Sequence, residues 1–543
     1  MARSSTLLLI SMSTDGTTTE DTRGSDGARS TKISEVRNVV MNWGSFLVAA
    51  VAGLALSPML IRALGKESYG VWVLVGALVG PLSLLDLGVR TAVTRLVARH
   101  HALHEHERAS AVASTARLLY AAAGLIAIVT ASVFAVGLSR WFTVPAELAS
   151  EASFAIVVVG AALAINLSTD LHSGILMAVR RLDQVGLAGV VLEVVRVAAV
   201  LAVIWMAAGL YGLAVMTVCL AVARYLWLRW ASHRAYPQLV LTAQRPRRPD
   251  VKAILDISVF TTVIYAMGTV TNQVNTYMVG ATLPLAMVTF HAIGATLPTA
   301  VQSMSLPIAQ SVLPQASQLD ATGRIDAMRT LILDAGRYGA LATLPIILAF
   351  ITRGSTFLGV WAGEEFRGDS GPVLLVLSVA GIFQLGRHVL QTVFIGSGRH
   401  RQLIVWYGAE SVVTVLLSVV LVREFGITGA AWASAVPPIV ITGVVLPALV
   451  SRSFGLSPIS LWMSLWIRPL VALTPYALLS WYTDRQWPAT GYLAFFGQVA
   501  VTLPVAALGA LTLGLSATER TNLETQLRSG VRNMRDRMHR ARR

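Results

Sequence analysis

The chain has 543 residues, of which 55% are hydrophobic and only 13% charged, and its formal net charge is +15. Soluble domains carry about 25% charged residues, so this composition excludes an ordinary globular enzyme and predicts a polytopic membrane protein. The single cysteine, Cys219, excludes a disulfide framework and a cysteine-based metal site within one chain. We expect no metal site and no cofactor.

Both ends of the sequence are polar and the middle is apolar. Residues 1–38 are expected to form a disordered cytoplasmic tail, because the stretch 13–32 has one apolar residue, Ala28. Residues 516–543 are expected to form a basic cytoplasmic tail near anionic lipid headgroups. Between the tails lie fourteen runs of about 20 mostly apolar residues, the length that spans a bilayer. These runs are 39–61, 69–89, 112–138, 152–178, 185–209, 211–228, 254–279, 285–313, 329–352, 372–396, 402–422, 427–450, 463–482 and 490–514.

The charges between the runs predict their orientation. With the N-terminus in the cytoplasm, 31 Lys and Arg fall in inside segments, 7 in outside segments and 5 within spans. This asymmetry follows the positive-inside rule and predicts that both tails are cytoplasmic in a multi-pass membrane protein. The outside loops are short, and the longest, at about 353–371, is too short to form an extracytoplasmic domain.

The sequence predicts an all-α architecture with two similar parts. A basic cytoplasmic linker, 229–253, separates a six-helix bundle at 39–228 from a second at 254–450, and 451–515 adds two helices. The two bundles would be parallel repeats that are pseudo-symmetric around a central cavity, with the substrate path between them.

A polar stripe follows the seventh run. Thr261, Tyr265, Thr269, Asn272 and Asn275/Thr276 recur at spacings of three and four, so they share one helix face. Amide groups facing lipid are costly, so this face must contact protein or water. The stripe either bonds helices together or lines a hydrated cavity, and its length favours the cavity.

Ionisable residues inside the spans are the next signal, since each is costly in a bilayer. Two pairs are expected to neutralise each other locally, Asp86 with Arg90 and Glu193 with Arg196. Arg387 has no carboxylate at helical spacing, so an unpaired guanidinium is expected there. Such a group suits a phosphorylated ligand, whose oxygens it can hold in a bidentate manner.

The region 58–98 resembles a known family. Pro58, Leu64-Gly65, Tyr69-Gly70 and Leu85-Asp86-Leu87-Gly88 are similar to the opening of polysaccharide flippases of the multidrug/oligosaccharidyl-lipid/polysaccharide (MOP) exporter superfamily. The stretch from Asn272 resembles the seventh helix of that family, where an acidic residue often stands in place of Asn275. The resemblance extends over about 35–515.

The resemblance implies an alternating-access transporter, not an enzyme, that flips a polyprenyl-diphosphate-linked oligosaccharide across the bacterial plasma (inner) membrane for surface polysaccharide assembly. Polysaccharide polymerase and glycosyltransferases would be partners, and no nucleic acid is expected. A coupling ion, H⁺ or Na⁺, is not identified by the sequence. The alternatives are a cation-coupled multidrug exporter of the same superfamily and an integral-membrane glycosyltransferase or polymerase, for which no outer loop with a carboxylate pair is found.

The expected substrate site combines cationic and polar residues, and no catalytic residue is expected. Arg387 would contact the diphosphate, with Arg196 and Arg117 assisting. The other expected substrate-binding residues are Asn272, Asn275, Gln391, Asp170 and His172. Pro58, Pro298 and Pro307 are expected hinges, because proline removes a helix hydrogen bond and favours bending.

Overall fold

A computed structural model describes residues 52–86, 88–242, 248–399, 401–515 and 520. The described part is α-helical, as predicted. Nine of its helices are long and apolar enough to cross a membrane, and the shorter apolar helix Ala52–Leu64 precedes them. The predicted tails, most of the first span and the middle of the linker lie outside the described residues.

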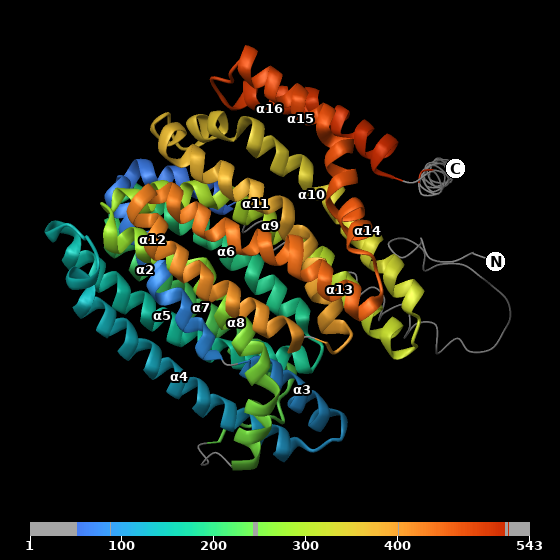
Figure 1. The fold of residues 1–543 in the computed structure, drawn as a ribbon. Helices are drawn as coiled ribbons and strands as arrows, with labels where there is room; N and C mark the ends of the chain where they lie inside the picture. Colours follow the sequence, from blue (N-terminus) through green and yellow to red (C-terminus); the bar gives the residue numbers. More distant parts are fainter. Residues whose placement is uncertain (1–51, 87, 243–247, 400, 516–519, 521–543) are drawn as a thin grey trace, which may run out of the picture.

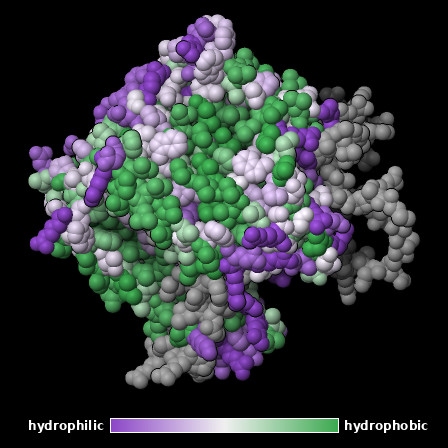
Figure 2. All heavy atoms as spheres, in the orientation of Figure 1, coloured by the Kyte–Doolittle hydropathy of each residue, from purple (hydrophilic) through white to green (hydrophobic). Residues whose placement is uncertain are grey.

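Helices lie side by side along one common direction, with α4 at one edge of the molecule and α15 and α16 at the other, beside α10 (Figure 1). Figure 2 shows hydrophilic residues gathered toward the two ends of the helices and an apolar band between them, the surface expected of a membrane protein. The helices of the first part are α2 (Lys66–Val79), α3 (Val89–Ala102), α4 (His106–Trp141), α5 (Ala146–Ala178), α6 (Leu182–Trp205) and α7 (Gly209–Ala235). Those that follow are α8 (Arg248–Thr282), α9 (Ala286–Ala321), α10 (Ile325–Trp361), α11 (Glu365–Gly396), α12 (Arg401–Val440), α13 (Leu446–Phe454), α14 (Pro458–Trp462), α15 (Arg468–Gln486) and α16 (Tyr492–Gly509).

Two predicted boundaries are wrong. The run 69–89 is not one span of α-helix, because a 3-10 segment, Gly80–Asp86, follows α2 and begins with Gly-Pro. The predicted outer loop at 353–371 is mostly helix, since α10 continues to Trp361 and α11 begins at Glu365. Only residues 362–364 form a loop between these helices, so the apolar runs underestimate how far both helices extend past the membrane.

Breaks inside the long helices have local causes. The runs 402–422 and 427–450 join in α12 across a kink at Gly426, whose φ of 59° is favourable only for glycine. A π turn, Ile441–Val445, leads into α13, and a second, Met463–Ile467, joins α14 to α15. The expected hinge residues Pro58 and Pro298 lie within helices, and the side chain of Pro307 lies outside the described part. Bending at these prolines stays a prediction.

The apolar cores differ between the two ends of the helices. We call residues 52–242 the first half and 248–454 the second half. At the end where α2, α5, α9 and α11 begin, a single core contains residues of both halves, including Leu74 and Leu213 of the first and Leu285 and Phe366 of the second. We call this the joined end.

At the opposite end, the split end, the described residues form separate cores. One core belongs to the first half, and Ile254 of α8 is its one member from the second half. Another is built from α9 to α14 and the π turn that follows, and it includes Met328, Phe394 and Trp466. The two halves therefore share apolar packing at one end of the helices and pack largely independently at the other.

Candidate functional site

The joined end is closed by polar contacts as well as by apolar packing. Lys66 at the start of α2 forms an ion pair with Glu365 at the start of α11. Its ammonium also lies 5.4 Å from the centroid of the Phe290 ring, and its carbonyl accepts a 2.6 Å hydrogen bond from Thr289 Oγ1. Lys66 thus contacts three residues of the second half. No pattern in the sequence indicates these contacts, because the partners lie more than 200 residues away.

Further hydrogen bonds join the two halves at or near the joined end. The Thr143 backbone N–H donates to the Gly280 carbonyl at 3.0 Å, and the Tyr277 hydroxyl donates to the Ala77 carbonyl at 2.7 Å. The Trp361 indole N–H donates to the Leu54 carbonyl at 2.8 Å. Each acceptor is a backbone carbonyl, so the helices themselves, and not only flexible side chains, are held together.

Gly70 allows α2 of the first half to lie directly against the start of α9 in the second half. A Cβ atom at this position would lie 2.5 Å from the backbone oxygen of Leu285 and 3.1 Å from Thr289 Oγ1. Any side chain there would collide with backbone that cannot rotate away. The second glycine of the sequence motif around Tyr69 therefore has a packing reason, which is direct contact between α2 and the start of α9.

Arg387 corrects the most important sequence expectation, because its guanidinium is paired. Arg387 Nη1 donates to both carboxylate oxygens of Glu410, at 2.7 and 2.8 Å, and the guanidinium lies 4.4 Å from the centroid of the Tyr407 ring. The Glu410 side chain is 3% exposed and that of Arg387 is 15% exposed. Glu410 lies on the next helix, α12, so helical spacing within α11 could not reveal it.

One member of the polar stripe on α8, Asn275, and Thr271 beside the stripe form hydrogen bonds to α12. Asn275 is buried, its amide nitrogen donates to Ser434 and its amide oxygen accepts a 2.7 Å hydrogen bond from Ser418. Thr271 Oγ1 lies 3.0 Å from the Ser411 hydroxyl. At Asn275 the bonds tie α8 to both parts of α12, as the helix-joining alternative expects, and substrate binding by Asn275 stays a prediction. Asn272 is exposed, and the side chains of the stripe's first two members lie outside the described part.

The expected site residues of the first half have structural partners. Arg196 is paired with Glu193, with Nε 3.0 Å from one carboxylate oxygen, as expected for that pair. Arg117 Nη2 donates to the Thr242 carbonyl at 3.0 Å and so holds the segment that follows α7 against α4. His172 Nδ1 lies 2.9 Å from the Ser232 hydroxyl of α7.

The expected local pair of Asp86 with Arg90 is wrong. The Arg90 guanidinium lies 3.6 Å from Asp170 of α5 instead. Asp86 accepts a hydrogen bond from the Tyr120 hydroxyl at 2.5 Å and from the Arg90 backbone N–H at 3.4 Å. Four elements therefore meet in one ionic cluster at the split end of the first half, and the side chains prefer partners on other helices to neighbours on their own.

The eight expected substrate-binding residues are thus distributed over several places. Arg387 and Gln391 lie one turn apart on α11, Asn272 and Asn275 lie on α8, and the remainder lie on α4, α5 and α6. Within the described residues, no group of three or more His, Cys, Asp or Glu is placed to hold a metal ion.

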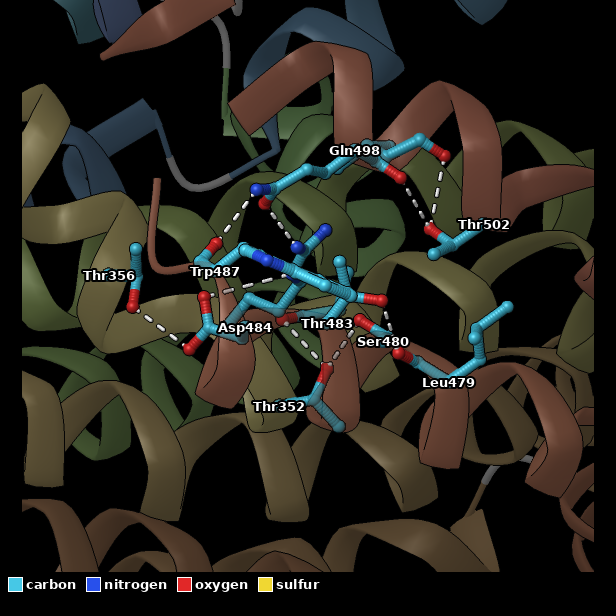
Figure 3. Close-up of polar contacts among 12 residues, drawn as sticks. Thr352, Thr356, Leu479, Ser480, Thr483, Asp484, Trp487, Gln498 and Thr502 are labelled. Carbon is cyan, nitrogen blue, oxygen red and sulfur yellow. Dashed lines mark hydrogen bonds and ion pairs between the residues drawn. The ribbon is translucent and has the colours of Figure 1, made fainter. Parts of the chain in front are cut away.

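A further buried polar cluster fastens the last two helices to α10. The Arg353 side chain is fully buried, with Nε 3.8 Å from Asp484 Oδ1 of α15 and Nη2 bonded to Gln498 of α16. Thr356 donates to Asp484 at 2.9 Å, and Gln498 donates to the Trp487 carbonyl at 2.8 Å. Figure 3 shows Thr356, Asp484, Trp487 and Gln498 gathered where the three helices meet.

Comparison with known proteins agrees with the helical fold. Residues 36–320, more than half of the chain, match the family described as "Polysaccharide biosynthesis protein". A "Putative O-antigen transporter" from Shigella flexneri is 30% identical over 87 residues, which span 16% of this chain and 21% of that relative. The chain thus matches about a fifth of that relative's length.

Two solved structures share the fold at low sequence identity. The lipid II flippase MurJ in an inward closed conformation has a TM-score of 0.69 and 11% identity, over 88% of this chain and 98% of that one. An inward-facing multidrug resistance MATE family transporter of the MOP superfamily has a TM-score of 0.62 and 18% identity, over 75% of this chain and 96% of that one. The chain therefore belongs to the polysaccharide biosynthesis protein family and shares the fold of these two membrane transporters.

Proposed function

We propose that this protein flips a polyprenyl-diphosphate-linked oligosaccharide across the bacterial plasma membrane by alternating access. One observation carries the proposal: the halves share a core at the joined end and have separate cores at the split end. A transporter of this kind must open one end while the other is closed, and the joined end has the contacts of a closed gate. The family match to polysaccharide biosynthesis supports a sugar-containing substrate.

The positive-inside rule gives the proposal a direction. The connections between helices at the split end hold more Lys and Arg than those at the joined end, so the split end would face the cytoplasm and the joined end the outside. The substrate is made in the cytoplasmic leaflet, and its sugars would enter between the halves while the polyprenyl chain stays in lipid. Closing the split end and opening the joined end would then release the sugars outside.

The orientation makes the first testable prediction. In a Cys219→Ser background, Glu364→Cys in the loop between α10 and α11 should react with a membrane-impermeant thiol reagent added to intact cells. Thr322→Cys, exposed just before α10, should react only after the membrane is permeabilised. Equal labelling of both cysteines in intact cells would contradict the orientation.

The substrate class is tested by transport itself. A deletion strain should accumulate a lipid-linked oligosaccharide in the cytoplasmic leaflet, and purified protein in vesicles should move a polyprenyl-diphosphate sugar between leaflets. Export of a cationic dye without movement of the lipid-linked sugar would instead support the multidrug exporter.

The second prediction concerns Arg387, which we infer contacts the diphosphate. A charge-assisted contact contributes about 1.5–3 kcal/mol, so Arg387→Ala should weaken binding roughly tenfold to a hundredfold. Arg387→Lys keeps the positive charge but loses the planar guanidinium that binds two oxygens at once. This variant should therefore retain more export than Arg387→Ala. Surface polysaccharide is measured in a complementation strain after membrane abundance is matched, because Arg387→Ala also leaves Glu410 buried without its cation. Wild-type export by an abundant Arg387→Ala protein would exclude this site.

A further inference from the structure

Arg387 has N–H groups beyond those that bond Glu410. One nitrogen, Nη1, donates both hydrogen bonds to the carboxylate. The guanidinium also carries N–H groups on Nε and Nη2. Glu410 is almost fully buried, so its charge is poorly screened and acts on whatever approaches the guanidinium. The pair has no net charge, whereas a lone arginine would be a strong anion site.

We propose that Glu410 sets the affinity of the substrate site by competing with the diphosphate for Arg387, so that the substrate can be released. This inference rests on the proposed function. A transporter must bind its substrate strongly enough to load it and weakly enough to let it leave. With no substrate bound, Glu410 offsets the charge of a buried arginine; with substrate bound, its negative charge opposes the phosphate.

The contacts around the pair limit how far the Glu410 carboxylate can move. The Tyr407 ring lies against the guanidinium at 4.4 Å, and α12 is fixed to α8 near Glu410 through Ser411, whose hydroxyl lies 3.0 Å from Thr271 Oγ1. The carboxylate is therefore held on a fastened helix, and the more exposed arginine is the partner with freedom to change contacts. The exchange needs movement of one side chain and no movement of α12.

The test compares binding with transport in Glu410→Gln, which keeps the shape of the side chain and removes its charge. Purified full-length protein is titrated with a polyprenyl diphosphate, and with a polyprenyl monophosphate and a polyprenol for comparison. We expect the variant to bind the diphosphate about tenfold more tightly than wild type, to bind the polyprenol equally, and to transport more slowly. Glu410→Asp keeps the charge and should bind with nearly the affinity of wild type.

Asp334→Asn is the matched control, because Asp334 forms a 2.8 Å pair with Arg337 on α10 that we place outside the site. It should leave the diphosphate affinity unchanged. If folded Glu410→Gln protein binds the diphosphate no more tightly than wild type, Glu410 only stabilises the fold and the inference is wrong.

Two further outcomes keep the test decisive. If Glu410→Gln does not fold, it is replaced by Glu410→Ala, which is produced and titrated at lower temperature. Unchanged diphosphate affinity in Glu410→Ala would also contradict the inference. If wild type itself does not bind the diphosphate, the proposed function fails first, and this result is distinguishable from a failure of the role of Glu410 alone.

Discussion

Replacing Gly70 with alanine is expected to cause the largest loss of transport of any single methyl group added to α2. The new Cβ would lie 2.5 Å from the Leu285 backbone oxygen, so α2 and α9 must separate at the joined end. Overpacking of this kind costs about 1–3 kcal/mol. If that cost falls on the closed gate, the ratio of closed to open gate falls by roughly 5- to 150-fold.

Gly76→Ala is the control, because it lies on the same helix and a Cβ there would meet no atom within 4 Å. Alanine also favours helix over glycine, so this variant should transport normally and be slightly more stable. Export of surface polysaccharide and membrane abundance are measured for both variants.

A second readout reports the gate directly. In the Cys219→Ser background, a cysteine at Leu285, which is 2% exposed, should react faster with an impermeant reagent when Gly70 is alanine. Normal export by Gly70→Ala, or equal reactivity in both backgrounds, would show that the joined end is not a moving gate.

Gly70 also shows how far the fold could be predicted from the sequence. Apolar runs predict the helices because each must satisfy its backbone hydrogen bonds internally in lipid. The motif around Tyr69 includes Gly70, but the residue that Gly70 contacts, Leu285, is more than 200 residues away in the chain. The break after α2 begins with Gly-Pro, a local signal that an average of hydropathy over a window does not detect.

The candidate site was predictable only where partners are local. Glu193 and Arg196 are three residues apart on one helix, and they pair as expected. Arg387 and Glu410 lie on different helices, as do Arg90 and Asp170, so spacing along the chain misassigned both arginines. A buried charge selects the partner that tertiary packing brings closest, and a single sequence does not contain that distance.

Asp484→Ala is expected to cause the largest loss of stability. Removing one partner of a buried ion pair usually costs about 3–5 kcal/mol, because the other charge stays buried. Asp484 keeps 18% of its side chain exposed, so we expect the lower end of that range, about 3 kcal/mol. Arg353 would keep Gln498 as a partner but no carboxylate, and Thr356 would lose its acceptor. The attachment of α15 to α10 should therefore loosen first.

Thermal unfolding in detergent measures the effect, and two other variants identify its cause. Ser480→Ala removes a neutral hydrogen bond between α15 and Thr352 of α10, so it should cost only about 1 kcal/mol. The double variant Arg353→Met, Asp484→Leu removes both charges and keeps the volume, so it should recover most of the stability lost in Asp484→Ala. If the double variant is as unstable as Asp484→Ala, the loss of stability comes from packing and not from a buried arginine left without its carboxylate. If Asp484→Ala unfolds like wild type, the cluster does not hold α15 and α16 to the second half.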